Sequence, residues 1–299
     1  MSIWKYFFLF IILSYNSFGQ GLKTNGDKIV DQNGNEVILR GMGLGGWMLM
    51  EGYMMQSSDV ADTQHEFRER LIELIGTTKT DEFFDSWHKN HVTKADIDSL
   101  ASWGFNSVRL PMHYNLFTLP IQDEPISGEN TWLEKGFTMV DELLDWCKSN
   151  EIYLILDLHA APGGQGANAA ISDYDSDLPS LWESNENKSK TVALWKKLAE
   201  RYKSEAWLGG YDLLNEVNWT LENENEDLRL LYEQITDSIR SVDTDHIIFI
   251  EGNGFANDFR GLTPPWDDNM VYSFHKYWST NNEGSIDWVL KIREEHNVP

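Results

Sequence analysis

Six short runs of apolar and β-branched residues recur along this chain of 299 residues. They cover residues 38–42, 107–112, 153–158, 210–215, 247–251 and 270–275, and amphipathic helical patterns cover residues 95–103, 132–150, 188–205, 228–242 and 286–295. Because each strand-plus-helix unit spans tens of residues, the strands are expected to be parallel, with the helices as crossovers between them. The pattern therefore predicts an α/β fold.

Two architectures fit this alternation: an open doubly wound sheet and a closed (β/α)8 TIM barrel. Residues 41–46 match the dinucleotide-binding pattern G-x-G-x-x-G letter for letter. However, residues 47–50 follow it without a helix start, and no phosphate-loop Lys-Ser/Thr pair follows either. The barrel is therefore favoured, and active residues are expected at the carboxyl ends of its strands.

The first 19 residues have the layout of a secretory signal peptide. Lys5 gives a basic start, an apolar run covers residues 6–13, and Ser17-Phe18-Gly19 forms a small-x-small cleavage site. The apolar run is too short to span a bilayer as a helix. We expect cleavage after Gly19, secretion to the extracellular space or periplasm, and one catalytic domain over residues 20–299.

The segment after the signal peptide predicts a β-hairpin. Residues 29–30 and 37–39 flank a turn at residues 31–35, in which Asn33-Gly34 is a strong turn signal. Further along, the acidic and polar residues 172–187 predict a long loop after the third strand of the barrel.

The charge balance excludes some classes of partner. The chain has 24 Lys+Arg against 48 Asp+Glu, a net charge of -24, which argues against nucleic-acid and anionic-membrane partners. Cys147 is the only cysteine, so no intrachain disulfide can form, and its helical pattern predicts a core residue. The 13 Trp and 11 Tyr residues can stack on sugar rings where they lie at strand ends.

Polar residues follow each predicted strand from the second onward. The strands end at or just before Arg109, Asp157 and His159, Asn215 and Glu216, Glu251, and His275 and Tyr277. Glycoside hydrolysis needs two carboxyl groups, one to protonate the leaving oxygen and one to attack or to activate water. Glu216 suits the acid, and the adjacent Asn215 can donate its amide to a sugar hydroxyl near the reacting carbon.

Plainer roles stay open for these residues. Arg109 can form an ion pair inside the barrel that holds a carboxylate ionised and oriented. His159 and His275 can be hydrogen-bonded rim residues without function, and Tyr277 and Trp278 can be packing residues.

The ordered set of motifs resembles glycoside hydrolase family 5, the cellulase-like barrels. It comprises residues 108–111 (Val-Arg-Leu-Pro), 157–159 (Asp-Leu-His), 215–216 (Asn-Glu) and 275–277 (His-Lys-Tyr), with 39–47 similar to the first strand of that family. The resemblance implies a retaining glycosidase with Glu216 as acid/base. It places the substrate around Arg109, His159, Asn215, His275 and Tyr277. The aromatic Trp278 after the same strand is a further candidate for substrate binding. Residues 45–51 and 159–165 are closer to its exo-β-1,3-glucanase branch.

The same resemblance places the nucleophilic glutamate on a seventh strand, after the helix at 286–295. Only four residues follow that helix. We therefore expect a C-terminally truncated barrel that lacks strands seven and eight, a nucleophile beyond residue 299, and no activity from this chain alone. Two unpaired sheet edges would favour aggregation. Glu251 is not expected to replace the nucleophile, because on the fifth strand it would approach from another direction.

Two other functions were weighed. A non-catalytic carbohydrate-binding barrel would keep the aromatic rim without a nucleophile, although it has little use for an Asn215-Glu216 pair. A metal-dependent hydrolase using His159 and His275 is disfavoured, because no H-E-x-x-H ligand pair occurs. We expect no cofactor or metal, a β-glucan or related substrate and a monomer when complete. The sugar, the linkage, and endo or exo action stay open.

Overall fold

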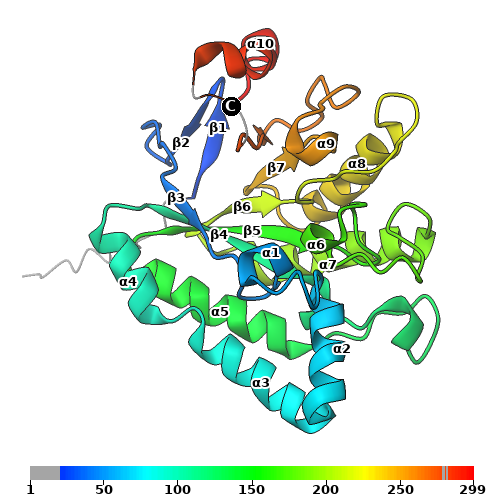
Figure 1. Cartoon of the computed structure of the whole chain (residues 1–299). Coiled ribbons are helices and arrows are strands. Elements are labelled where there is room, and N and C mark those ends of the chain that lie inside the picture. The colour runs from blue at the N-terminus through cyan, green and yellow to red at the C-terminus, as the bar shows by residue number, and fades with distance from the viewer. Residues whose placement is uncertain (1–20, 278–279, 281) are drawn as a thin grey trace, which may run out of the picture.

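The fold is a curved, fully parallel sheet of six strands, seen in the computed structural model (Figure 1). The model describes residues 21–277, 280 and 282–299, so the predicted signal peptide (1–19) and Trp278 lie outside the described residues. The sheet order is β3 (Gly41–Gly43), β4 (Ser107–His113), β5 (Tyr153–Ala160), β6 (Leu208–Asp212), β7 (Ile247–Glu251) and β8 (Met270–Ser273). All six predicted strands are confirmed, with bounds that differ by a few residues.

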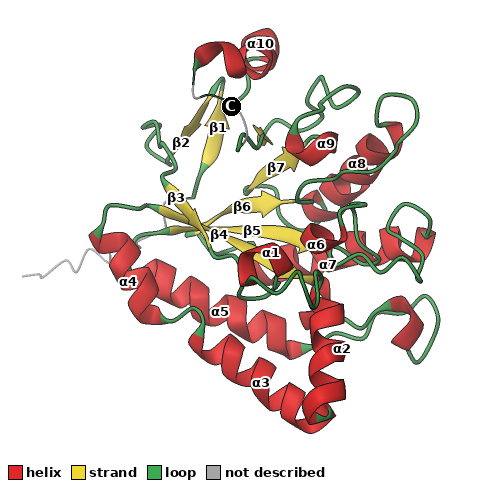
Figure 2. Ribbon diagram, in the orientation of Figure 1, coloured by secondary structure: helices red, strands yellow, loops and turns green. Residues whose placement is uncertain are grey.

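The five predicted crossover helices are also present and lie outside the sheet (Figure 2). They are α4 (Lys94–Ser102), α5 (Glu134–Ser149), α7 (Asn185–Tyr202), α8 (Glu226–Arg240) and α10 (Asp287–His296). In α5, Phe137, Val140, Leu144 and Cys147 recur every three or four residues and are all buried. They form one face against the sheet, and the prediction that Cys147 belongs to the core is confirmed.

Several elements were not predicted. Two helices, α2 (Gln64–Ile75) and α3 (Thr77–Asn90), fill the connection between β3 and β4. Short helices follow other strands: α1 (Gly52–Met55), α6 (Ala169–Ser172), α9 (Asn253–Ala256), and the 3-10 turns η1 (Tyr114–Leu116), η2 (Ile121–Asp123) and η3 (Glu283–Ser285). Because α6 ends at residue 172 and α7 begins at residue 185, most of the predicted 172–187 loop is confirmed.

The predicted N-terminal hairpin is wrong in its second strand. The hairpin pairs β1 (Lys23–Asn25) with β2 (Lys28–Val30) through a turn at Gly26-Asp27, and Gly26 has a φ of 59°. Residues 37–39 form no strand. The chain returns to β2 through an isolated bridge between Val30 and Glu36 and through the Val37 N–H, which donates to the Ile29 carbonyl at 2.8 Å. The Asn33-Gly34 signal does mark a turn, in which the Asp31 carboxylate accepts the backbone N–H groups of Asn33 and Asn35.

The sheet is a partial barrel whose two outer strands are β3 and β8. The hairpin β1–β2 and α10 lie beside each other (Figure 1), joined by an ion pair of 2.6 Å between Arg293 and Asp27. A cavity of about 340 Å³ lies between them. On the outer side of β8, the Tyr272 N–H donates to the Pro299 carbonyl at 3.1 Å. Among the described residues, no helix is long and apolar enough to cross a membrane.

Candidate active site

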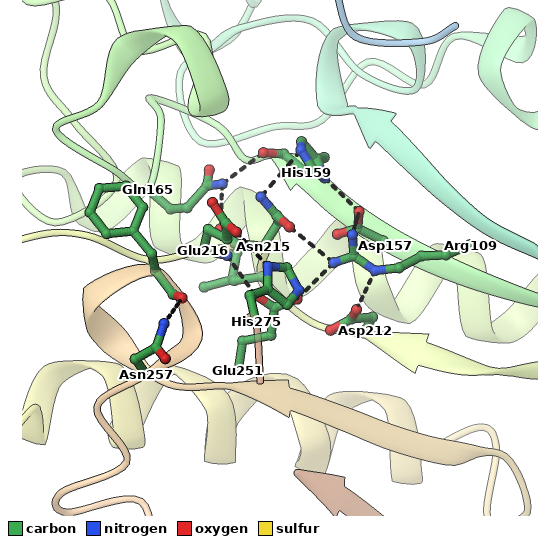
Figure 3. Close-up of polar contacts among 12 residues, drawn as sticks. Arg109, Asp157, His159, Gln165, Asp212, Asn215, Glu216, Glu251, Asn257 and His275 are labelled. Carbon is green, nitrogen blue, oxygen red and sulfur yellow. Dashed lines mark hydrogen bonds and ion pairs between the residues drawn. The ribbon is translucent and has the colours of Figure 1, made fainter. Parts of the chain in front are cut away.

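Arg109 on β4 is the centre of a buried charge network (Figure 3). Its guanidinium contacts Asp157 on β5 at 2.9 Å, Asp212 on β6 at 2.8 Å and Glu251 on β7 at 2.7 Å. The side chains of these three carboxylates are at most 3% exposed. The network forms because parallel strands direct their alternate residues to the same interior.

The charges in this network shift one another. Burial alone would lower the pKa of Arg109, but the three carboxylates outweigh burial and raise it. Burial raises the pKa of Asp212, and Glu251 adds to this effect against Arg109. The predicted ion pair of Arg109 inside the barrel is therefore present, and it holds three carboxylates where one was expected.

Arg109, Asp157, His159 and Asn215 form a closed ring of contacts (Figure 3). Arg109 Nη2 donates to Asn215 Oδ1 at 3.0 Å, and Asn215 Nδ2 lies 3.2 Å from His159 Nε2. His159 Nδ1 lies 2.7 Å from Asp157 Oδ2, which also accepts from Arg109. Because arginine can only donate, the orientation of the Asn215 amide is fixed, and one Nδ2 hydrogen is left to face a ligand.

His159 has two alternative partners for its Nε2 atom. The neutral imidazole can accept from Asn215 at 3.2 Å, whereas the protonated ring can donate to Glu51 Oε1 at 3.5 Å. Burial would lower the pKa of His159, but Asp157 and Glu51 outweigh it and raise the pKa to about 9. The protonation state of His159 therefore decides whether it holds Asn215 or Glu51.

Glu216 follows β6 and binds His275, which follows β8. His275 Nδ1 is hydrogen-bonded to Glu216 Oε1, and His275 Nε2 lies 3.2 Å from Glu251 Oε1. Burial would lower the pKa of His275, but the bonds to Glu216 and Glu251 raise it to about 10. The imidazole thus bridges a rim carboxylate and a fully buried one.

The backbone of Glu216 is strained and firmly held. Its φ of 40° lies in the left-handed region, which a residue with a Cβ adopts at a cost of about 1–3 kcal/mol. Its N–H donates to Glu251 Oε2 at 2.7 Å. The fully buried Gln165 donates to the carbonyls of His159 and Asn215 at 2.7 and 2.8 Å, which fixes the adjoining loops.

Two partly exposed tyrosines, Tyr53 and Tyr277, contact residues of the site. Tyr277 is 73% exposed and its ring meets His275 edge-on, with centroids 5.9 Å apart. Tyr53 is 58% exposed, and its pKa is raised by burial of its hydroxyl and by a hydrogen bond to Glu51. Exposed rings beside a carboxylate pair suit a sugar, whose C–H faces pack on aromatic rings.

The structure brings together the predicted site residues Arg109, His159, Asn215, Glu216, His275 and Tyr277. Sequence reasoning missed Glu51, Tyr53, Gln165 and Asp212 as members of the site. Asp212 ends β6, so strand-end position was a usable signal for it, whereas Glu51 and Tyr53 lie eight and ten residues beyond the end of β3. Gln165 ends the 159–165 motif, but sequence reasoning assigned it no role of its own. Among the described residues, no group of three or more His, Cys, Asp or Glu is arranged to hold a metal ion.

Comparison with known proteins places this geometry in context. The family model for cellulase, glycosyl hydrolase family 5, matches residues 30–297. A β-xylosidase of Phanerodontia chrysosporium is 35% identical over 258 residues, covering 86% of this chain and 52% of that protein. A probable glucan 1,3-β-glucosidase A of Aspergillus clavatus is 26% identical over 255 residues, covering 82% of this chain and 57% of that protein. The chain thus spans little more than half the length of these relatives.

A solved structure gives the same fold. The β-glucanase of Saccharophagus degradans, determined with cellotetraose, superposes with a TM-score of 0.59 at 19% sequence identity. The match covers 92% of this chain and 68% of that one. The fold of such neighbours is a (β/α)8 barrel, to which the six-stranded sheet described here corresponds in part.

Proposed function

Since this chain belongs to the cellulase family, glycosyl hydrolase family 5, we propose that it carries the acid/base half of a retaining β-glycosidase site. Glu216 is the acid/base, and Arg109, His159, Asn215, His275 and Tyr277 surround the sugar whose bond is cleaved. Trp278 is proposed as a further sugar contact from its sequence position alone.

One observation carries this proposal: the Glu216 carboxyl group is hydrogen-bonded to the His275 imidazole and is next in sequence to Asn215, whose amide is oriented by Arg109. His275 can deliver or accept a proton at Glu216 Oε1, which suits a group that first protonates the leaving oxygen and then deprotonates water. The second Nδ2 hydrogen of Asn215 is available for a sugar hydroxyl to accept.

The second carboxyl group is proposed to lie beyond residue 299, on a strand that completes the eight-stranded barrel. Glu251 does not fit the role of the nucleophile. It is fully buried, and its two oxygens already contact Arg109, His275 and the Glu216 N–H. In a retaining site the two carboxyl groups should be about 5–5.5 Å apart. We accordingly expect no sugar release from residues 20–299 alone.

The acid/base role is tested in the chain extended to a full barrel, with Glu216→Ala and an aryl glycoside whose leaving group needs no protonation. The first step should stay fast with this substrate, and hydrolysis of the intermediate should slow by about 10²–10⁴-fold. Azide should restore turnover and give a β-glycosyl azide. Equal loss on activated and unactivated substrates, without azide rescue, would contradict the assignment.

The substrate is proposed to be a β-glucan or a β-glucoside. The named relatives include a β-xylosidase as well as a glucan 1,3-β-glucosidase, so the sugar must be tested directly. Parallel assays with aryl β-glucoside, aryl β-xyloside, laminari-oligosaccharides and cello-oligosaccharides compare kcat/KM. A preference for the xyloside of tenfold or more would replace glucose by xylose in the proposal.

A sugar-binding barrel without turnover is the second candidate, favoured by the aromatic rim of Tyr53 and Tyr277. Calorimetric binding of an oligosaccharide by the extended chain, with no product after prolonged incubation, would select it.

We further propose export through residues 1–19. N-terminal sequencing of the secreted protein should begin at Gln20, and a retained Met1 would exclude cleavage.

A further inference from the structure

Asp173, in the loop between β5 and α7, joins three segments that are far apart in sequence. Its Oδ1 accepts both the backbone N–H of His65, at 2.9 Å, and the His65 ring at Nδ1, at 2.9 Å. Its Oδ2 lies 2.8 Å from His113 Nε2. His65 is in the first turn of α2 and His113 ends β4, so one carboxylate, 6% exposed, connects all three segments.

The hydrogen bonds fix the form of His113. Its Nδ1 accepts the backbone N–H of Asn115 at 3.1 Å, so that atom carries no hydrogen. The remaining hydrogen is therefore on Nε2 and is donated to Asp173 Oδ2. His113 therefore donates to Asp173 through Nε2 and accepts from Asn115 through Nδ1.

The same loop is joined to the segment that carries Glu216. The N–H groups of Ala167 and Asn168 donate to the carbonyl and side-chain oxygens of Asn218, at 3.1 and 2.7 Å. Asn218 Nδ2 in turn donates to the Glu216 carbonyl at 2.9 Å. Tyr174, the neighbour of Asp173, meets Trp219 edge-on with ring centroids 5.3 Å apart. These contacts form one wall beside Glu216.

We propose that Asp173 is a positioning residue, which through His65 and His113 holds the wall of residues 165–174 and 218–219 against the segment bearing Glu216. Asp173 acts at a distance, since it contacts neither Glu216 nor any other residue of the Arg109 network among the described contacts. The proposal adds a role to the proposed glycosidase site and rests on that site only for its catalytic consequence.

The charges around Asp173, His65 and His113 define the pH range in which their contacts are strongest. His65 faces Asp173, Asp175 and Glu66, and the hydrogen bond to Asp173 is the main cause of its raised pKa. Burial would raise the pKa of Asp173, but His113 and His65 lower it to about 2. The stabilisation from Asp173 is complete above its unfolded pKa near 3.9, and that from His65 is complete below about 6.5. The stabilisation from His65 is lost as the pH rises through the raised pKa of His65.

Asparagine cannot replace Asp173, although it has the same shape. One side-chain oxygen of Asn can still accept from His65, but its Nδ2 would then face His113 Nε2 as a second donor. His113 could accept there only by giving up its bond to Asn115. A merely space-filling residue would tolerate Asp173→Asn, so this variant separates the positioning role from a packing role.

Hydrogen exchange, measured by mass spectrometry, tests the positioning role of Asp173 in the full chain without any need for catalysis. Asp173→Asn is compared with Asp177→Asn, an exposed carboxylate in the same loop. Exchange of residues 165–174 and of the first turn of α2 should rise together by about tenfold in Asp173→Asn, as expected when hydrogen bonds to a charged group are lost. Asp177→Asn should match the parent chain.

A second variant keeps the test decisive if Asp173→Asn does not fold. His65→Asn retains a donor near the position of Nδ1 but cannot carry charge. In the parent chain, exchange corrected for intrinsic rates should rise as the pH increases above about 6.5 and through the raised pKa of His65, and in His65→Asn this rise should disappear. Equal pH dependence in both chains, or faster exchange confined to residues next to 173, would overturn the proposal. Normal exchange in Asp173→Asn would also overturn it. Faster exchange as predicted, together with no sugar release by a complete barrel, would count against the glycosidase proposal alone.

Discussion

At the scale of single residues, Arg109 is one cation among three buried carboxylates. Arg109→Met removes the cation and leaves these carboxylates uncompensated, so the free energy of unfolding should fall by about 3–5 kcal/mol. Urea denaturation measures the loss. Arg260→Met, which breaks the surface pair with Asp258, is the matched control and should cost about 1 kcal/mol or less. Equal losses in the two variants would show that Arg109 stabilises the fold no more than a surface ion pair does.

His275 gives stability a specific pH dependence. Its pKa is raised to about 10 in the folded chain, by Glu216 and Glu251 against burial, and is near 6.5 when unfolded. The stabilisation is therefore complete below about pH 6.5 and is lost as the pH rises through about 10. The stability difference between the parent chain and His275→Gln should shrink over that range in urea titrations. A constant difference would show that His275 is neutral throughout.

The left-handed backbone at Glu216 makes glycine and alanine inequivalent there. Both remove the carboxylate, but only alanine keeps a Cβ that is strained at a φ of 40°. Glu216→Gly should be more stable than Glu216→Ala by about 1 kcal/mol, measured by thermal or urea unfolding. The reverse order would mean that the strain is relieved in the variants.

Single residues of the site were predictable where strand ends placed them. Arg109, His159, Asn215, Glu216 and His275 each follow a recognisable strand, and they do meet. Gln165 could not be found this way, because its two carbonyl partners become neighbours only after the sheet has curved.

At the scale of elements, α2 depends on its capping box. The Thr63 hydroxyl accepts the Glu66 N–H, and the Glu66 carboxylate accepts the Thr63 N–H. Thr63→Ala should lower the free energy of unfolding by about 1 kcal/mol. Thr78→Ala, in the exposed first turn of α3, is the control and should be close to neutral. Urea denaturation of both variants decides whether the cap contributes.

The elements that sequence reasoning found are those with a buried face. The six strands and five crossover helices carry apolar periodicity because they pack on one another. α2 and α3 bury little, only Gln64 in α2 and Thr80 and Phe84 in α3, and the Thr63–Glu66 spacing was an unused signal for the start of α2. The hairpin prediction failed for a local reason. Asn33-Gly34 does form a turn, but the Asp31 carboxylate accepts the N–H groups of Asn33 and Asn35, so the turn belongs to a loop and does not join two strands.

At the scale of the whole molecule, β3 and β8 are the edge strands of the sheet, and of these β8 already donates its Tyr272 N–H to the Pro299 carbonyl. Ile38 is 64% exposed and Met42, on β3, is 43% exposed. Free edges with apolar side chains pair with other chains, so the purified chain should associate with rising concentration. Met42→Lys should reduce this association, as measured by sedimentation velocity. A parent chain that stays monomeric at high concentration would contradict the expectation.

The fold class was predictable because the order of strands and helices determines it. The charge balance of the interior was not, because a sequence does not state which carboxylates share a cation. Asp157, Asp212 and Glu251 come from three strands and converge on Arg109 only in the folded sheet.

The closed ring of Arg109, Asp157, His159 and Asn215 has an evolutionary consequence. Each member contacts two others, so a single substitution breaks two contacts of the ring, and its cost is not independent of the remaining three residues. Energies of double variants within the ring should therefore be non-additive. Natural variation at these four positions should be correlated, while diversity in sugar preference should accumulate in the loops that surround them.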